Sequence, residues 1–165
     1  MAKKNSKKPQ LLSTDALISD NRKANYEYFL EDKIEAGIVL TGTEVKSLRH
    51  GQCGLQESHI APKKGELWLL NAHIPEYQQA GPHLQHAPRR PRKLLLSARQ
   101  MDKLMGSVQR EGYTIVPTKI YFNTKGLAKL EIALAKGKKD HDKRETIKER
   151  DWNRQKQRVL RNERD

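Results

Sequence analysis

The 165-residue sequence is poor in features that would support a disulfide scaffold or a membrane span. It has one cysteine, Cys53, so no internal disulfide can form, and a lone thiol fits a reducing compartment. No apolar run approaches the roughly 20 residues needed to cross a bilayer, and the Leu11-Leu12 pair is too short for a signal-peptide core. We therefore expect a soluble cytoplasmic protein.

The last thirty residues have very few apolar side chains. Lys136–Asp165 carries 12 Lys or Arg and 7 Asp or Glu, but its apolar residues are four: Ile147, Trp152, Val159 and Leu160. Such a segment cannot bury enough apolar surface to offset the entropy lost on ordering. We expect a basic tail that is intrinsically disordered when free and becomes helical against a polyanion, with Trp152 available to stack on a base or ribose.

Positive charge is present throughout the chain, which has a net charge of +13. Residues 1–20 contribute +2, residues 21–135 contribute +6 and the tail contributes +5. Basic clusters recur at Arg22-Lys23, in 89–93 and in 136–139, at the ends of predicted structural elements. Charge runs often serve solubility alone, but this one-sided excess favours nucleic-acid contact over an anionic membrane. Charge does not separate RNA from DNA, although no recognition-helix pattern is present.

Hydrophobic content divides the chain into three parts. Residues 21–135 contain 47 hydrophobic residues, enough for a core, whereas the tail has four. We therefore predict a basic flexible N-terminus over 1–20, a folded domain over 21–135 and the basic tail over 136–165.

Alternating hydrophobicity predicts strands within the folded domain. Tyr26–Leu30 and 37–42 are strand-like, and Glu66–Ile74 alternates with Trp68, Leu70, Ala72 and Ile74 on one side. A hairpin is expected across Asn123–Gly126, between strands at Tyr113–Phe122 and Leu127–Leu134. The inward residues of its second strand would be Ala128, Leu130, Ile132 and Leu134.

Two helices are predicted between these strands. Thr43 is a plausible N-cap for a short helix over Glu44–Arg49, which Gly51 would close. Ser97 and Gln100 form a capping box ahead of Met101, Leu104, Met105 and Val108 at helical spacing, and Gly112 ends that helix. Strands joined by short links with so few helices favour a mainly β, small antiparallel barrel.

The sequence offers weak support for an enzyme. Glu44 and Lys46 have the Glu-x-Lys spacing of metal-dependent nucleases, with Asp32 as a conceivable second carboxylate, but such residues recur by chance. His83-x-x-His86 lacks other ligands nearby and is better explained as loop histidines. The 136–139 cluster lacks the first glycine and the Ser/Thr of a phosphate-binding loop. We expect no catalytic residue, metal or cofactor.

Five strings in one order resemble a known family. They are 42–49 (GTEVKSLR), 65–68 leading to 73–75, 92–96 (RKLLL), 116–117 with 121–122, and 137–144 (GKKDHDKR). Together they are similar to the SsrA-binding protein (small protein B, SmpB) family, the bacterial partner of transfer-messenger RNA (tmRNA). The resemblance covers about residues 21–152.

The resemblance implies an OB-like β-barrel that binds the tRNA-like domain of tmRNA, and a tail that becomes helical in the empty mRNA channel of a stalled ribosome. It implies RNA-binding residues at Asn21, Arg22, Lys23 and Glu35, with Lys46, Arg49, Arg92 and Lys93 added. It implies decoding-centre and mRNA-channel contacts at Gly137, Lys138, Lys139, His141, Asp142, Lys143, Arg144 and Trp152. A monomer that delivers tmRNA for trans-translation is expected. The alternative is a general barrel-type RNA chaperone or ribosomal protein.

Overall fold

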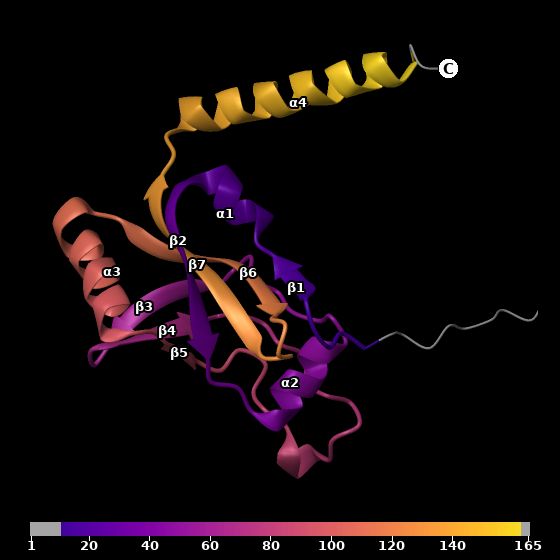
Figure 1. Cartoon of the computed structure of the whole chain (residues 1–165), viewed down its shortest axis with the longest axis vertical. Coiled ribbons are helices and arrows are strands. Elements are labelled where there is room, and N and C mark those ends of the chain that lie inside the picture. Colours follow the sequence, from indigo (N-terminus) through magenta and orange to yellow (C-terminus); the bar gives the residue numbers. More distant parts are fainter. Residues whose placement is uncertain (1–10, 163–165) are drawn as a thin grey trace, which may run out of the picture.

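A computed structural model describes residues 11–162, which form a curved sheet flanked by helices (Figure 1). Within this range the elements in chain order are β1 (Ala16–Asp20), α1 (Arg22–Glu27), β2 (Tyr28–Ile38), α2 (Gly42–Arg49), β3 (His59–Lys63), β4 (Glu66–Leu70), the 3-10 helix η1 (Pro82–Leu84), β5 (Arg92–Leu95), α3 (Ala98–Glu111), β6 (Thr114–Phe122), β7 (Ala128–Gly137) and α4 (Asp140–Asn162).

The seven strands of the described residues form one sheet in the order β1-β6-β7-β2-β5-β4-β3. Every neighbouring pair is antiparallel. In addition, β3 packs against β6, which brings the two ends of the sheet together. The predicted mainly β, antiparallel barrel is therefore confirmed.

The predicted hairpin supplies much of the core. Leu130 lies opposite Ile120, and Leu134 lies opposite Ile115, in the β6–β7 pair. These four side chains are buried, as is Ile132 between them, so the predicted inward face of β7 is correct. Burying such aliphatic side chains contributes about 1.5–3 kcal/mol each to folding.

The predicted alternation of Glu66–Ile74 does not continue along the whole segment. Leu67 and Leu69 are buried, whereas Trp68, on the other side of β4, is only partly covered. After the strand ends at Leu70, the buried positions become Ala72 and Ile74, which the alternation had placed on the side of Trp68. The reason is Asn71, whose φ of +58° turns the backbone and shifts the alternation by one residue.

The two predicted helices are both present. α3 begins after its Ser97 N-cap, buries Leu104 and ends at Gly112, whose φ of +67° is left-handed. α2 starts earlier than expected, because its N-cap is Thr41 and not Thr43. The backbone N–H of Thr41 donates to Oε2 of Glu44 at 2.8 Å, which fixes the first turn.

The ordered part of the chain is longer at both ends than the boundaries at 21 and 135. β1 pairs with β6 at residues 16–20, and Leu12 exchanges hydrogen bonds with Arg49. The first ten residues of the predicted flexible N-terminus lie outside the described range. At the other end β7 continues to Gly137, which pairs with Tyr28 before α4 begins.

α4 projects away from the barrel beyond α1 (Figure 1). Residues 147–161 of this helix are all exposed. None of the helices within residues 11–162 is both long enough and apolar enough to cross a bilayer.

Candidate nucleic-acid interface

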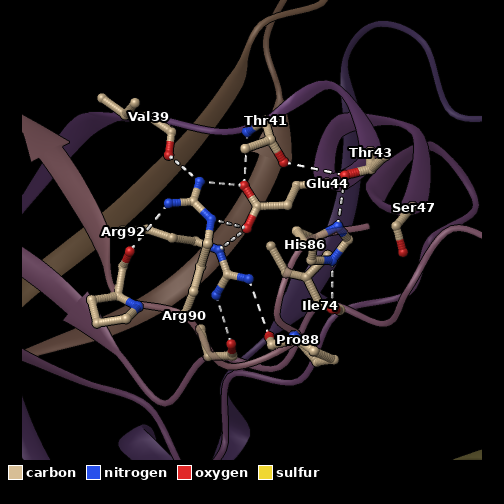
Figure 2. Close-up of polar contacts among 12 residues, drawn as sticks. Val39, Thr41, Thr43, Glu44, Ser47, Ile74, His86, Pro88, Arg90 and Arg92 are labelled. Carbon is tan, nitrogen blue, oxygen red and sulfur yellow. Dashed lines mark hydrogen bonds and ion pairs between the residues drawn. The ribbon is translucent and has the colours of Figure 1, made fainter. Parts of the chain in front are cut away.

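A fully buried ion pair lies between α2 and β5, as Figure 2 shows. Oε1 of Glu44 accepts from Nε of Arg92 at 2.8 Å, and both side chains are 0% exposed. Arg90 adds two hydrogen bonds to the same carboxylate, at 2.8 and 2.7 Å. Burial alone would raise the pKa of Glu44, but hydrogen bonds from Arg90 and Thr41 and the charge of Arg92 hold it below its ordinary value.

Arg92 therefore has a structural role, which corrects its assignment as an RNA contact. Its remaining donors go to the carbonyl oxygens of Ala72 at 2.7 Å and Pro88 at 3.1 Å. A guanidinium with no exposed surface and internal acceptors on every side cannot reach a phosphate while the fold is intact. The cluster instead ties the long loop between β4 and β5 to α2 and β5.

The same geometry removes support for the nuclease alternative. Glu44 is saturated by two arginines and a backbone N–H, so no lone pair faces solvent for a metal ion. Asp32 pairs with Lys103 of α3 at 3.0 Å. Among the described residues no group of three or more His, Cys, Asp or Glu could hold a metal.

His86 lies in the loop between η1 and β5, as expected for a loop histidine, but its side chain is held inside the fold. It is buried, and its Nε2 donates to the carbonyl oxygen of Ile74 at 2.9 Å (Figure 2). Its Nδ1 is hydrogen-bonded to the hydroxyl of Thr43 at 2.8 Å. His86 therefore fastens the loop to α2, and His83 lies in η1.

Cys53 is not placed for thiolate chemistry. Burial raises the pKa of its thiol to about 12, despite the nearby charge of Arg92, so the thiol stays protonated at neutral pH.

Asn21 positions the neighbouring cations. It is 4% exposed, caps α1 by accepting from the N–H of Ala24 at 3.3 Å, and donates to the carbonyl oxygen of Pro117 at 2.9 Å. Both ends of its amide are thus in use within the fold. Arg22 and Lys23, which follow it, are exposed at the start of α1, with Lys23 in weak ion pairs to Glu27 and Glu57.

Glu35 lies at an accessible position on β2. Its Oε2 accepts from the hydroxyl of Tyr121, and Nζ of Lys129 lies 4.0 Å from its Oε1. Burial and the hydrogen bond to Glu35 raise the pKa of Tyr121 to about 12. A shallow groove runs past Glu35, Tyr121 and Lys119, so this face could receive a ribose or a base edge.

The cationic side chains of α2 and β5 differ in their solvent exposure and in their contacts within the fold. Lys46 is exposed, whereas Arg49 is half-buried, donates to the carbonyl oxygen of Leu12 at 3.1 Å and lies 5.0 Å from the Phe122 ring centroid. Lys93 is partly exposed and pairs with Glu66 of β4 at 2.5 Å. Lys46 is thus available to a phosphate. Lys93 can exchange its partner for a phosphate at little cost, since a surface pair such as Lys93–Glu66 is worth about 0–1 kcal/mol.

The start of the tail is a joint in which Lys138 is central. Its N–H donates to the carbonyl oxygen of Glu27 at 2.9 Å, and its Nζ donates to that of Asn25 at 3.1 Å. The same ammonium lies 3.3 Å from Oγ1 of Thr146 and 5.0 Å from the Phe29 ring centroid. Lys138 therefore joins α1, β2 and α4.

The remaining tail residues are largely accessible. Oδ2 of Asp142 accepts from the N–H of Lys139 at 3.1 Å and so caps the start of α4. The other carboxylate oxygen of Asp142, Oδ1, lies 3.1 Å from Nε2 of His141. His141 and Trp152 are 68% and 67% exposed, respectively. Lys143 makes a weak pair with Asp140 at 3.8 Å, and Arg144 is exposed. Gly137 is exposed where β7 ends.

The structure thus groups some of the predicted residues and separates others. Arg22 and Lys23 belong to α1, which contacts α4 and Lys138, whereas Lys46 and Arg49 belong to α2 at the other end of the barrel (Figure 1). Sequence reasoning did not anticipate the internal role of Arg90 or the partnership of Tyr121 with Glu35. Tyr121 could have been flagged, since alternation with the buried Ile120 places it outward.

The sequence model of the SmpB protein family matches residues 18–162. The chain belongs to this family. The membership confirms the resemblance that the five strings carry.

Individual relatives agree. The chain is 59% identical over 145 residues to the SsrA-binding protein of Afipia carboxidovorans, covering 88% of this chain and 92% of the relative. It is 56% identical over 154 residues to the SsrA-binding protein of Brucella canis, covering 93% of this chain and 97% of the relative. A chain of the solved structure "tmRNA-SmpB: a journey to the center of the bacterial ribosome" is 45% identical, with a TM-score of 0.61, covering 74% of this chain and 85% of that one.

Proposed function

We infer that this protein is an RNA-binding ribosome-rescue factor. It binds the tRNA-like domain of tmRNA and delivers it to stalled ribosomes in the cytoplasm for trans-translation. The observation that carries this conclusion is the family match over 18–162, together with the 45% identity to an SmpB chain solved with tmRNA and the ribosome. Members of this family are RNA-binding factors and not enzymes, in agreement with the internal position of Glu44.

The barrel is the part that holds tmRNA. Its accessible cations, Arg22, Lys23, Lys46 and Lys93, lie on α1, α2 and β5, which are rigid elements of the fold. Contacts from such side chains to phosphates fix the register of an RNA without reading its sequence. Glu35 and its partner Tyr121 add acceptors and donors for riboses and bases, while Asn21 and Arg92 keep the surrounding backbone in place.

The tail is the part that acts on the ribosome. α4 has 23 residues, which gives a rod of about 35 Å. Arg154, Arg158 and Arg161 recur at spacings of four and three, so they share one side of the helix, where a shallow hollow lies between them. A thin helix with a cationic side suits a channel lined by ribosomal RNA, and exposed His141 and Trp152 offer flat rings for stacking on its bases.

A general RNA chaperone or ribosomal protein is the alternative, and capture of RNA from lysate separates the two. We expect the tagged full-length protein to recover mainly one structured RNA with a tRNA-like domain. The double variant with Arg22→Glu and Lys23→Glu changes two exposed side chains. It should lower the recovery of this RNA without unfolding the barrel. Recovery of many unrelated RNAs in proportion to their abundance would contradict the proposed function.

A further inference from the structure

At the far end of the barrel from α4, two aromatic side chains that the sites above leave unused lie beside Lys46 and form a ring-and-cation cluster with it. The ring centroids of His50 and Tyr77 are 5.9 Å apart with an angle of 31° between their planes. Nζ of Lys46 lies 5.5 Å from the Tyr77 centroid. His50 and Lys46 are exposed and Tyr77 is half-buried, so this cluster is accessible and belongs to no hydrophobic core.

The segment that carries Tyr77 is held in place before any ligand arrives. The side chain of Gln85 accepts from the N–H of Tyr77 at 3.1 Å and donates to the carbonyl oxygens of Tyr77 at 2.5 Å and Ala80 at 3.1 Å. Ser47 of α2 donates to the carbonyl oxygen of Pro75 at 2.8 Å. These bonds fix the position of the tyrosine relative to α2, which lowers the entropy lost on binding.

A small hollow lies beside the rings. Its volume is about 140 Å³, and its lining residues are Ser47, His50, Gln52, Glu76, Tyr77, Gln78 and Gln79. Drug-sized ligands occupy pockets of roughly 300–1,000 Å³, so this hollow suits one flat ring system. Aromatic and amide side chains are the groups with which proteins receive unstacked bases of RNA.

We propose that this hollow binds one unpaired guanine of the bound RNA. The base would stack on Tyr77 and His50, and the carboxylate of Glu76 would accept from the imino and amino groups of its Watson–Crick edge. Glu76 would repel a phosphate, so the base enters the hollow and Lys46 meets the adjoining phosphate. This inference rests on the proposed function and deepens it, by naming a nucleotide site for the barrel. Because α2 and α4 lie at opposite ends of the molecule (Figure 1), the guanine belongs to tmRNA and not to the mRNA channel.

The test combines affinity with kethoxal probing, which modifies the Watson–Crick edge of unpaired guanines. The full-length protein is titrated against the tRNA-like domain of tmRNA, and protected guanines are mapped. We expect Tyr77→Ala to weaken binding about tenfold, to expose one guanine and to leave the salt dependence unchanged, because stacking releases no counterions. Tyr77→Phe should bind like the wild type, and Lys46→Ala should instead lower the salt slope by about one.

Two further variants keep the test independent of folding. Glu76→Gln alters an exposed side chain and should abolish protection of the same guanine while other protections remain. Tyr113→Ala, at a half-buried tyrosine that lies just before β6, serves as the matched control and should protect that guanine normally. Equal affinity and equal protection for the wild type, Tyr77→Ala and Glu76→Gln would overturn the nucleotide site alone. Absence of tmRNA binding by the wild type would overturn the proposed function as well.

Discussion

Nε of Arg92 lies 2.8 Å from Oε1 of Glu44, and neither side chain has any exposed surface. A buried pair of this kind does not by itself make a fold more stable than an apolar core would. Its consequence here is geometric, since the same two side chains tie α2 to β5 and, through Ala72 and Pro88, to the long loop. Lys46 and Tyr77 are positioned by those elements.

Breaking this pair should destabilise the barrel strongly. We expect Arg92→Met to lower the free energy of unfolding by about 3–5 kcal/mol, because Glu44 would stay buried without its fully buried cationic partner. Denaturant titration followed by circular dichroism measures the loss. Lys93→Met, one residue along and paired only with the partly exposed Glu66, is the control and should cost no more than about 1 kcal/mol. Equal losses in both variants would contradict the structural role assigned to Arg92.

The same carboxylate should make the protein sensitive to acid. Although burial acts to raise the pKa of Glu44, hydrogen bonds from Arg90 and Thr41 hold it below its ordinary value of 4.5 in the folded state. The unfolded chain therefore binds this proton more tightly, so the stabilisation is present above pH 4.5 and is lost as pH falls through the lower folded pKa. Stability measured between about pH 5 and 3 should fall less steeply for Glu44→Gln than for the wild type. Parallel curves would show that another group governs acid unfolding.

Lys138 should control how the tail leaves the barrel. Lys138→Met keeps the aliphatic stem but removes the ammonium, which contacts Asn25, Thr146 and the Phe29 ring. We expect unchanged tmRNA affinity, faster hydrogen exchange over residues 139–146 and lower peptide tagging in a reconstituted translation reaction. Lys139→Met alters the neighbouring exposed lysine and is the control for exchange. Wild-type exchange and tagging in Lys138→Met would show that the joint has no function.

The outer part of α4 should be stable only on the ribosome. Residues 147–161 are exposed throughout, and isolated helices of this length are marginal in water. We expect their amides to exchange rapidly in the free protein and to become protected when the protein and tmRNA occupy a stalled ribosome. Strong protection in the free protein would contradict the prediction that this tail orders only on its target.

Local sequence signals predicted the elements whose stability is itself local. The Ser97 cap, the apolar spacing through Val108 and the stop at Gly112 all lie within α3, and each was predicted correctly. Strand alternation likewise identified the inward face of β7. At Asn71 the same reasoning failed, because one left-handed residue reverses the alternation and periodicity cannot show it.

The roles of polar residues depended on contacts distant in sequence. Arg92 and Asn21 read as surface groups, yet their acceptors are distant in sequence. Arg92 donates to Glu44 of α2, and Asn21 donates to Pro117 of β6, which is 96 residues away. Family resemblance predicted a set of RNA-binding positions, but it could not separate side chains exposed for a contact from those that are buried in the fold. The exposure of Lys23 and Trp152 agrees with their prediction as surface contacts, and Lys23 makes only weak ion pairs within the fold.

The division of labour between barrel and tail is tested most directly by truncation after Lys139. This variant removes residues 140–165 but keeps all of β7 and the Lys138 contacts to Glu27 and Asn25. Affinity for tmRNA and tagging of a stalled peptide are measured on the same preparation. We predict affinity within about twofold of the wild type, because the strands of the barrel and the Lys138 contacts to α1 are kept, together with abolished tagging. Loss of tmRNA affinity, or tagging at the wild-type level, would contradict the account.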